Sequence, residues 1–247
     1  MITTELARAS TELSHEIRRQ IGFLINRRGV IESIIVGTDR QLVIPLLARS
    51  RSGSRLLRGV RFVHTHLKDQ PLTKDDLTDL ALLRLDMMVA IGVGEQGEPA
   101  HISVAHLLPP NPEGKSYLEF PPTAFHSFQL EFQEFIQSLE SEIAGGSPAL
   151  IATETRPGAL LVSVFSRSRV EQEERLRETK ELITSQGIEI LGTVEQRLVN
   201  VNPKFVMGVG KLTDVIIRAL QSGAELLIFD RDLTPTQIRS ISEITEM

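Results

Sequence analysis

Residues 159–164 read Ala-Leu-Leu-Val-Ser-Val, an apolar run whose length and composition are typical of a buried β-strand. From this run to the end of the sequence, helical and strand patterns alternate. The predicted elements that follow are a helix over 170–186 capped by Gly187, a strand over 188–195, a helix over 212–221 and a strand over 225–230.

A last helix is predicted to begin at Thr234-Pro235-Thr236-Gln237, which supplies an N-cap, a proline at the first helical position and a capping-box glutamine. Strands that alternate with helices form a parallel sheet with right-handed crossovers. The second half of the chain is therefore predicted to be a small parallel-sheet α/β domain. Three strands are few for such a sheet, so we expect this domain to be incomplete.

A stretch of small residues and proline, Ala144-Gly145-Gly146-Ser147-Pro148, marks the domain boundary. We predict a first domain over 1–145, a linker over 146–157 and the second domain over 158–247. In the first domain, apolar strands and amphipathic helices are interleaved, which predicts a mixed-sheet α/β sandwich. Its strands are expected over 21–25 and 30–36, joined by a turn at Arg27-Arg28-Gly29, and over 42–46, 60–64, 87–91 and 100–104; its helices are expected over 6–19, 74–85 and 124–143.

Composition excludes several classes of protein. The 247 residues include no cysteine, so disulfide frameworks, thiolate zinc sites and cysteine catalysis are excluded. Aromatic residues are 4% of the chain, which is too few for a platform that stacks single-stranded nucleic acid. The net charge is -5, and both halves are slightly acidic, which argues against a DNA-binding domain. The lack of a signal peptide and of a long apolar segment predicts a cytoplasmic protein without membrane contact.

His64-Thr65-His66 lies at the end of a predicted strand, where alternation directs both histidines to the same face. Asp76 follows in the first turn of a helix whose expected N-cap is Thr73. Two histidines and one carboxylate, with a fourth position left for water, are the ligands of a catalytic zinc. Glu32, on an earlier strand, is a candidate general base for that water.

These residues resemble the metal motif of the JAMM (MPN, RadC-like) family: an upstream Glu, then His-x-His, seven residues and Ser-x-x-Asp. Residues 30–38 are similar to the RadC-like strand that carries the Glu. The gap after His66 is six residues, Thr73 replaces the serine, and Leu67 replaces the usual proline. The resemblance implies a JAMM-like sandwich over about 18–110, a zinc cofactor and hydrolysis of an amide or isopeptide bond.

Three alternatives remain open for this first site. In the first, the histidines are strand-end polar residues, one hydrogen-bonded and one solvated, while Asp76 favours only its helix N-terminus. If the shorter loop rotates the helix, Asp75 replaces Asp76 as the ligand. A JAMM-like domain that has lost catalysis would act as a binding module.

Five arginines gather in a segment without acidic residues between Asp39 and Asp69. Such a segment is expected either to contact RNA phosphates or to be a solvated loop. The arginines are Arg49, Arg51, Arg55, Arg58 and Arg61.

From Gly158 onward the chain closely resembles the N-terminal domain of HflX-type ribosome-associated GTPases. Several motifs follow one another in the order and spacing of that family. They include 158–162, Glu173-Glu174-Arg175-Leu176, 192–197, 202–211, 224–230 and 233–239.

A glycine-rich turn before a helix can bind phosphate, but the P-loop pattern Gly-x4-Gly-Lys-Ser/Thr is not met around Gly208, Gly210 and Lys211. Phe205 and Leu212 occupy two of its required positions. We therefore predict no GTP site here. The glycines are expected to allow a tight entry into the helix, or, with Arg197 and Lys204, the segment contacts RNA or a GTPase domain.

The resemblance implies that GTP and Mg²⁺ bind a GTPase domain that lies beyond Met247 in a longer protein. It also implies that the large ribosomal subunit, or its rRNA, is a partner and that the family's own GTPase domain is another. The expected role is ribosome association and splitting under stress, and the alternative is zinc-dependent hydrolysis by the JAMM-like domain.

Overall fold

The computed structural model describes residues 2–45, 57–109, 111, 115–146, 156–165, 169–198, 201–245 and 247. Two compact units are present, and each is described by itself. The first consists of residues 1–108 and 117–140, and the second of residues 109–116 and 141–247. Most of the predicted linker, 147–155, lies outside the described residues.

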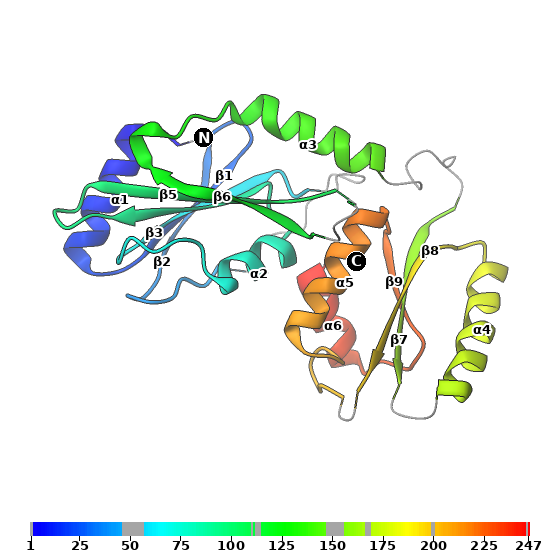
Figure 1. Ribbon diagram of the computed structural model, residues 1–247. Coiled ribbons are helices and arrows are strands. Elements are labelled where there is room, and N and C mark those ends of the chain that lie inside the picture. The colour runs from blue at the N-terminus through cyan, green and yellow to red at the C-terminus, as the bar shows by residue number, and fades with distance from the viewer. Residues whose placement is uncertain are drawn as a thin grey trace. The chain divides into compact units, whose positions relative to one another are not determined.

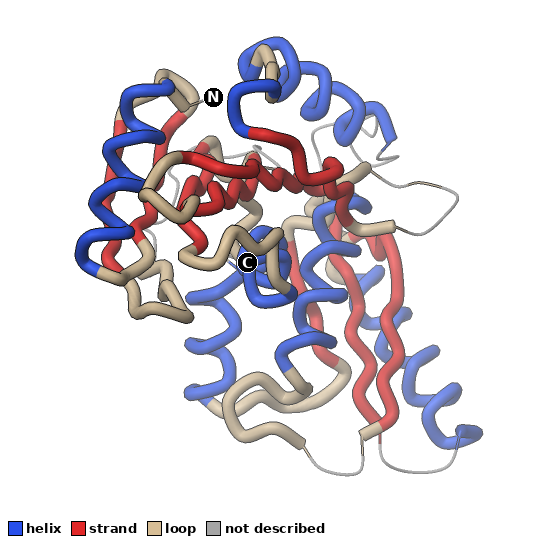
Figure 2. Tube along the Cα trace, turned by 60° about the vertical axis from the view of Figure 1, so that its left-hand side comes forward, coloured by secondary structure: helices blue, strands red, loops and turns tan. Residues whose placement is uncertain are grey.

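A mixed six-stranded sheet forms the first unit, in the order β2-β1-β3-β4-β5-β6 (Figures 1 and 2). Only β3 and β4 are parallel; the other neighbours are antiparallel. The strands are β1 (Ile21–Asn26), β2 (Ile31–Val36), β3 (Val60–His66), β4 (Met87–Val93), β5 (Pro99–Leu107) and β6 (Tyr117–Ala124). The helices are α1 (Thr4–Ile17), α2 (Lys74–Leu82) and α3 (Phe132–Gly146), with a short 3-10 turn η1 (Phe125–Ser127).

Helices α1 and α2 cover opposite faces of this sheet. Ser14 of α1 hydrogen-bonds Thr65 of β3 through their hydroxyl oxygens, 2.8 Å apart. Asp76 of α2 instead approaches His64 and His66, which point to the other face because strand side chains alternate. The central strand β3 is thus buried along its whole length.

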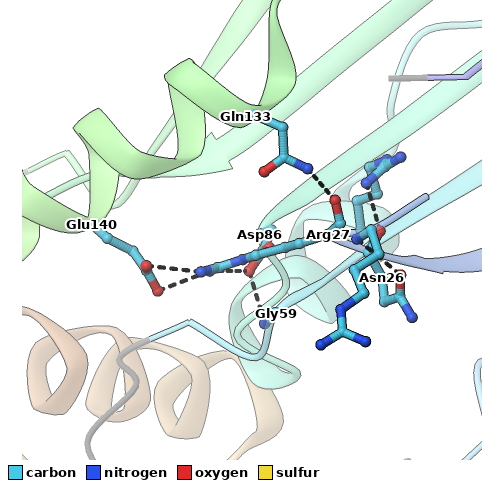
Figure 3. A network of polar contacts seen from close by, with 8 residues as sticks. Asn26, Arg27, Gly59, Asp86, Gln133 and Glu140 are labelled. Atoms are coloured by element: carbon cyan, nitrogen blue, oxygen red, sulfur yellow. Dashed lines mark hydrogen bonds and ion pairs between the residues drawn. The ribbon is translucent and has the colours of Figure 1, made fainter. Parts of the chain in front are cut away.

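A network of charges fixes α3 to the first unit (Figure 3). Arg27, in the β1–β2 turn, donates paired hydrogen bonds both to Asp86, which precedes β4, and to Glu140 of α3. Asp86 is completely buried and also accepts the backbone N–H of Gly59. Gln133 of α3 adds a hydrogen bond from its amide to the carbonyl of Arg27.

The second unit is a three-stranded parallel sheet in the order β8-β7-β9, with α4 on one face and α5 on the other (Figure 1). Its elements are β7 (Gly158–Phe165), α4 (Arg169–Ser185), β8 (Glu189–Arg197), α5 (Val209–Ser222), β9 (Leu226–Phe229) and α6 (Pro235–Thr245). Leu161, Leu176 and Ile183 form a buried cluster between β7 and α4. The capping box at α6 is formed as expected, with hydrogen bonds in both directions between Thr234 and Gln237.

The predicted fold class, a mixed-sheet α/β sandwich followed by a small parallel-sheet α/β domain, is confirmed. Two predicted elements of the first unit are wrong. Residues 42–45 form no strand; instead, Leu42 packs beside Gly22 and Gly37. The helix expected over 124–143 begins only at Phe132, because the residues before it belong to β6, η1 and an extended connection.

Candidate metal centre

The two histidines of β3 lie between strands whose adjacent residues are small. His64 pairs with Gly22 on β1 and with Ala90 on β4, while His66 pairs with Gly92. His64 and His66 are 1% and 2% exposed, so the expectation that one of them is solvated is wrong.

Asp76 reaches the histidines because its helix begins at a capping box. Thr73 accepts the backbone N–H of Asp76, and the Asp76 carboxylate accepts both the N–H and the hydroxyl of Thr73 at 2.7 Å. These bonds leave its Oδ1 3.3 Å from His64 Nε2 and its Oδ2 3.5 Å from His66 Nε2. The predicted placement of Asp76 toward the strand end is therefore found.

The three side chains have the spacing of metal ligands. The Nε2 atoms of His64 and His66 are 2.9 Å apart, and one ligand atom from each of the three residues lies within 4.8 Å of the others. Ligands placed about 2.0 Å from a tetrahedral zinc are about 3.3 Å from one another. The residues thus fit a zinc ion, with one coordination position left for a fourth ligand.

A hydrogen bond in the cluster fixes the tautomer of His66 so that one ring nitrogen can bind a cation. His66 Nδ1 lies 2.8 Å from the carbonyl of Gln70, so Nδ1 carries the proton and Nε2 offers its lone pair. Burial, followed by the neighbouring His64, lowers the pKa of His66. Burial alone would raise the pKa of Asp76, but hydrogen bonds from His64 and Thr73 and the charge of His64 outweigh it and hold this pKa well below its usual range. The buried Nδ1 of His64 has no partner among the described residues.

A second carboxylate of α2, Asp79, was not singled out from the sequence. Burial, followed by the charges of Asp76 and Asp75, raises the pKa of Asp79 to about 6, while nearby His64 opposes the shift. The sequence does contain a signal for it: Asp79 is three residues after Asp76, which places both on one side of a helix. Asp75, the alternative ligand, is exposed and lies outside the cluster.

Glu32 is not brought to the histidines. It lies on β2, which is separated from β3 by β1, and the register skips it, since Leu24 pairs with Ser33 and Ile25 with Ile31. Its carboxylate instead accepts a hydrogen bond from the Asn26 amide at 3.1 Å. Across the sheet, Glu32 is two strand spacings, or about 10 Å, from β3. Along the strand direction, it lies level with Arg61 rather than with His64.

Arg61, one of the five arginines expected either to contact RNA or to lie in a solvated loop, is instead buried in the sheet. Arg61 is 5% exposed, donates to the carbonyl of Asn26 at 2.9 Å, and stacks its guanidinium 4.2 Å from the centre of the Phe132 ring. It is a core residue of β3 and not an RNA contact. Arg58 is half-buried two residues before β3 begins, whereas Arg49, Arg51 and Arg55 lie outside the described residues.

The basic residues predicted for contacts in the second unit lie on three separate elements. Arg197 ends β8; Lys204 lies in a turn, with its ammonium 4.9 Å from the Phe205 ring; Lys211, in the first turn of α5, is 3.6 Å from Asp214.

Steric crowding does not require a glycine at either Gly208 or Gly210, before and at the start of α5. Gly208 has an ordinary φ of -65°, and a Cβ atom at Gly208 or Gly210 would meet no atom within 4 Å. Gly208 is the N-cap of α5, as the expected helix entry requires, but neither its φ nor close packing demands a glycine there.

Comparison with known proteins places the similarity in the second unit. Residues 173–247 match the family described as GTP-binding GTPase N-terminal. The chain is similar to the GTPase HflX of Caldanaerobacter subterraneus subsp. tengcongensis, with 34% identity over 85 residues, which are 34% of this chain and 19% of that protein. It is also 29% identical over 89 residues (35% of this chain, 22% of the relative) to the GTPase HflX of Flavobacterium psychrophilum, and 28% identical over 88 residues (36% and 20%) to that of Escherichia coli K12.

The chain thus spans about a fifth of the length of these curated relatives. The second unit is similar to the N-terminal region of HflX GTPases, and the likeness of the first unit to JAMM proteins stays a prediction. In the described part of the chain, no helix is long and apolar enough to cross a membrane.

Proposed function

We propose that this chain is the N-terminal region of an HflX-type GTPase and that its second unit binds the large ribosomal subunit. The observation that carries this proposal is the family match over 173–247, which covers most of a separately folded unit. No Gly-x4-Gly-Lys-Ser/Thr sequence occurs in the 247 residues, so binding and positioning are the roles of this region. GTP and Mg²⁺ would bind a GTPase domain, which is a second partner for the same unit.

Co-sedimentation with large ribosomal subunits tests the proposal. We expect the chain to pellet with the subunits and to be released by salt, since basic side chains that neutralise phosphates release counterions. Reversing the charges of Arg197, Lys204 and Lys211 together should lower the salt slope by about 2–3. The matched control reverses Arg177, Lys180 and Arg239, which lie on α4 and α6 of the same unit.

Binding that is equal for wild type and for the first triple variant contradicts the ribosomal role of these residues. Failure of the wild-type chain to pellet at low salt contradicts ribosome binding by this region as a whole.

We also propose that the first unit is a metal-binding module. The convergence of His64, His66 and Asp76 within 4.8 Å favours zinc, bound through two imidazole nitrogens and one carboxylate. A zinc bound there would supply a Lewis acid and an acidified water. The general base that the JAMM resemblance requires is remote, because Glu32 lies on β2 at the edge of the sheet. The geometry therefore favours a binding module derived from a hydrolase over a working hydrolase.

Metal analysis of the purified chain tests this second proposal. We expect bound zinc, and a rise in melting temperature when zinc is added to chelator-treated protein. The variant His66→Ala should lose both effects, whereas His101→Ala, which changes an exposed histidine outside the cluster, should keep them. Absence of zinc and of any thermal shift in the wild type contradicts the proposal, and hydrolysis of an isopeptide bond that depends on zinc contradicts the inactive form.

A further inference from the structure

The two histidines of β3 are held unequally by the neighbouring strands. On the β4 side, backbone pairing runs to the end of β3, where His66 pairs with Gly92. On the β1 side, the register of the described residues ends at the pair of His64 and Gly22, so the ladder stops between the two histidines. Contacts other than this ladder must therefore hold the end of β3 against β1.

The hydroxyl of Thr65, between the two histidines, makes such a contact. It accepts the backbone N–H of Ile21, the first residue of β1, at 2.9 Å. Its oxygen also lies 2.8 Å from the hydroxyl oxygen of Ser14 on α1. The Thr65 hydroxyl thus joins the end of β3 both to β1 and to α1.

The hydrogen bonds form a directed chain. Ser14 donates its hydroxyl proton to the carbonyl of Arg19 at 2.5 Å, so the proton shared with Thr65 comes from Thr65. The alternative acceptor for Thr65, the carbonyl of Ile21, is farther away at 3.5 Å. The chain therefore runs from the Ile21 N–H through the two hydroxyls to the Arg19 carbonyl, and each donor in it has an acceptor.

Burial makes this chain of hydrogen bonds hard to replace. Ser14 is completely buried and Thr65 is 1% exposed. A buried donor that loses its acceptor costs about 1–3 kcal/mol. Because strand side chains alternate, the bonds on the α1 face of Thr65 fix the backbone from which His64 and His66 point to the opposite face.

On the basis of the metal binding proposed above, we propose that Ser14 and Thr65 are positioning residues of that metal centre. Neither hydroxyl is a ligand; both act by holding the backbone between the two histidines, whose Nε2 atoms are 2.9 Å apart. Ligands of one tetrahedral zinc lie about 3.3 Å from one another, so a rotation of the strand end would move one nitrogen out of reach.

Cobalt binding by the whole chain tests this role, because the visible absorption of Co²⁺ reports the arrangement of its ligands. Thr65→Val keeps the shape of the side chain and removes the hydroxyl, whereas Thr65→Ser keeps the hydroxyl. We expect Thr65→Val to shift the Co²⁺ spectrum and to weaken zinc binding about tenfold, and Thr65→Ser to retain the wild-type values. Ser14→Ala removes the other hydroxyl and should act in the same direction as Thr65→Val, so it decides the question if Thr65→Val does not fold.

The matched control removes a buried hydroxyl that does not reach β3. Thr11 of α1 is completely buried, and its hydroxyl donates to the carbonyl of Arg8 in the same helix at 3.1 Å. Thr11→Val should keep the Co²⁺ spectrum and the zinc affinity of the wild type. Circular dichroism of the metal-free variants checks that each one is folded.

The outcomes separate the positioning role from the metal centre itself. A wild type that binds neither Co²⁺ nor zinc overturns both. Metal binding by the wild type that is unchanged in Thr65→Val and Ser14→Ala overturns the positioning role alone. A spectral shift in Thr11→Val or Thr65→Ser as large as that in Thr65→Val would trace the loss to general destabilisation, and it overturns the positioning role as well.

Discussion

Arg27 Nε lies 2.6 Å from the completely buried carboxylate of Asp86, which also accepts the backbone N–H of Gly59. Arg27 in turn pairs with Glu140 as well. Burial raises the pKa of Asp86. The hydrogen bonds from Arg27 and the positive charge of Arg27 oppose this shift. Burial penalises the ionised form of the carboxylate. The contribution of Asp86 to the stability of the folded state therefore falls as the pH rises above the ordinary pKa range of an aspartate. Arg27 limits this loss.

Replacing Arg27 should therefore destabilise the first unit in a pH-dependent way. Arg27→Met leaves Asp86 buried without its ion pair and with the hydrogen bond from the Gly59 N–H, at a cost of about 3–5 kcal/mol at pH 7. The cost should shrink toward pH 4, where Asp86 accepts a proton. Urea unfolding at the two pH values measures it, with exposed Arg28→Met as the control. An equal loss at both pH values would contradict this explanation.

Asp79 should limit stability at neutral pH. Its pKa is raised from 3.8 to about 6, so the folded state disfavours the ionised form and loses stability as the pH rises from about 4 to 6. Asp79→Asn should raise the free energy of unfolding of the metal-free protein at pH 7 by up to about 3 kcal/mol, the equivalent of the shift. The gain should vanish below pH 4. Glu95→Gln, which removes an exposed carboxylate that does not act on Asp79, is the control, and a gain that persists at pH 3.5 would count against the assignment.

Thr73 should act as a positioning residue for the metal centre. Thr73→Val removes the hydroxyl that caps α2 and also the hydroxyl hydrogen bond to Asp76. We expect a loss of about 1 kcal/mol in stability and of about tenfold in zinc affinity. Calorimetric titration with zinc measures the affinity. Thr78→Val, later in the same helix, should leave zinc affinity unchanged; if it weakens zinc equally, the cap is not what orients Asp76.

The second unit has a buried polar contact whose loss should be measurable. The hydroxyl of Ser163, on β7, donates to Asp230 at 2.5 Å and accepts the Gln172 amide at 3.1 Å. Ser163→Ala leaves both partners short of a hydrogen bond, with an expected cost of about 1–3 kcal/mol. Ser185→Ala, at the exposed end of α4, should cost less than 0.5 kcal/mol. Thermal unfolding of the two variants compares them, and similar melting temperatures would refute the prediction.

Elements whose signal is local were predicted from the sequence. Alternating strands and helices locate most of both units, and caps such as Thr234 with Gln237 are fixed by residues three positions apart. Strand β6 was missed because Pro121 and Pro122 read as a loop; an edge strand tolerates them since it pairs on one side only. The aromatic residues of the predicted helix 124–143 are divided among η1 (Phe125), the extended connection (Phe128) and α3 (Phe132 and Phe135). Phe128 and Phe135 both pack against Phe120 of β6, which a local helical pattern does not reveal.

The same distinction separates the predicted site residues that the structure brings together from those that it leaves apart. His64, His66 and Asp76 come together through strand alternation and a capping box, both of which are local. Glu32 depends on the order of strands and on a skipped residue in the register, which a single sequence does not encode in any nearby pattern. Arg61 is buried by Phe132, a residue 71 positions away along the chain.

All three candidate ligands of the first unit lie within residues 64–76, and this closeness affects how the protein folds. Closing so short a loop costs little entropy, so a cation can bridge these side chains before the distant strands of the sheet have paired. A metal that also binds the unfolded chain stabilises the native state less than its affinity implies. The ion would then act early, as a folding nucleus that joins the end of β3 to the start of α2.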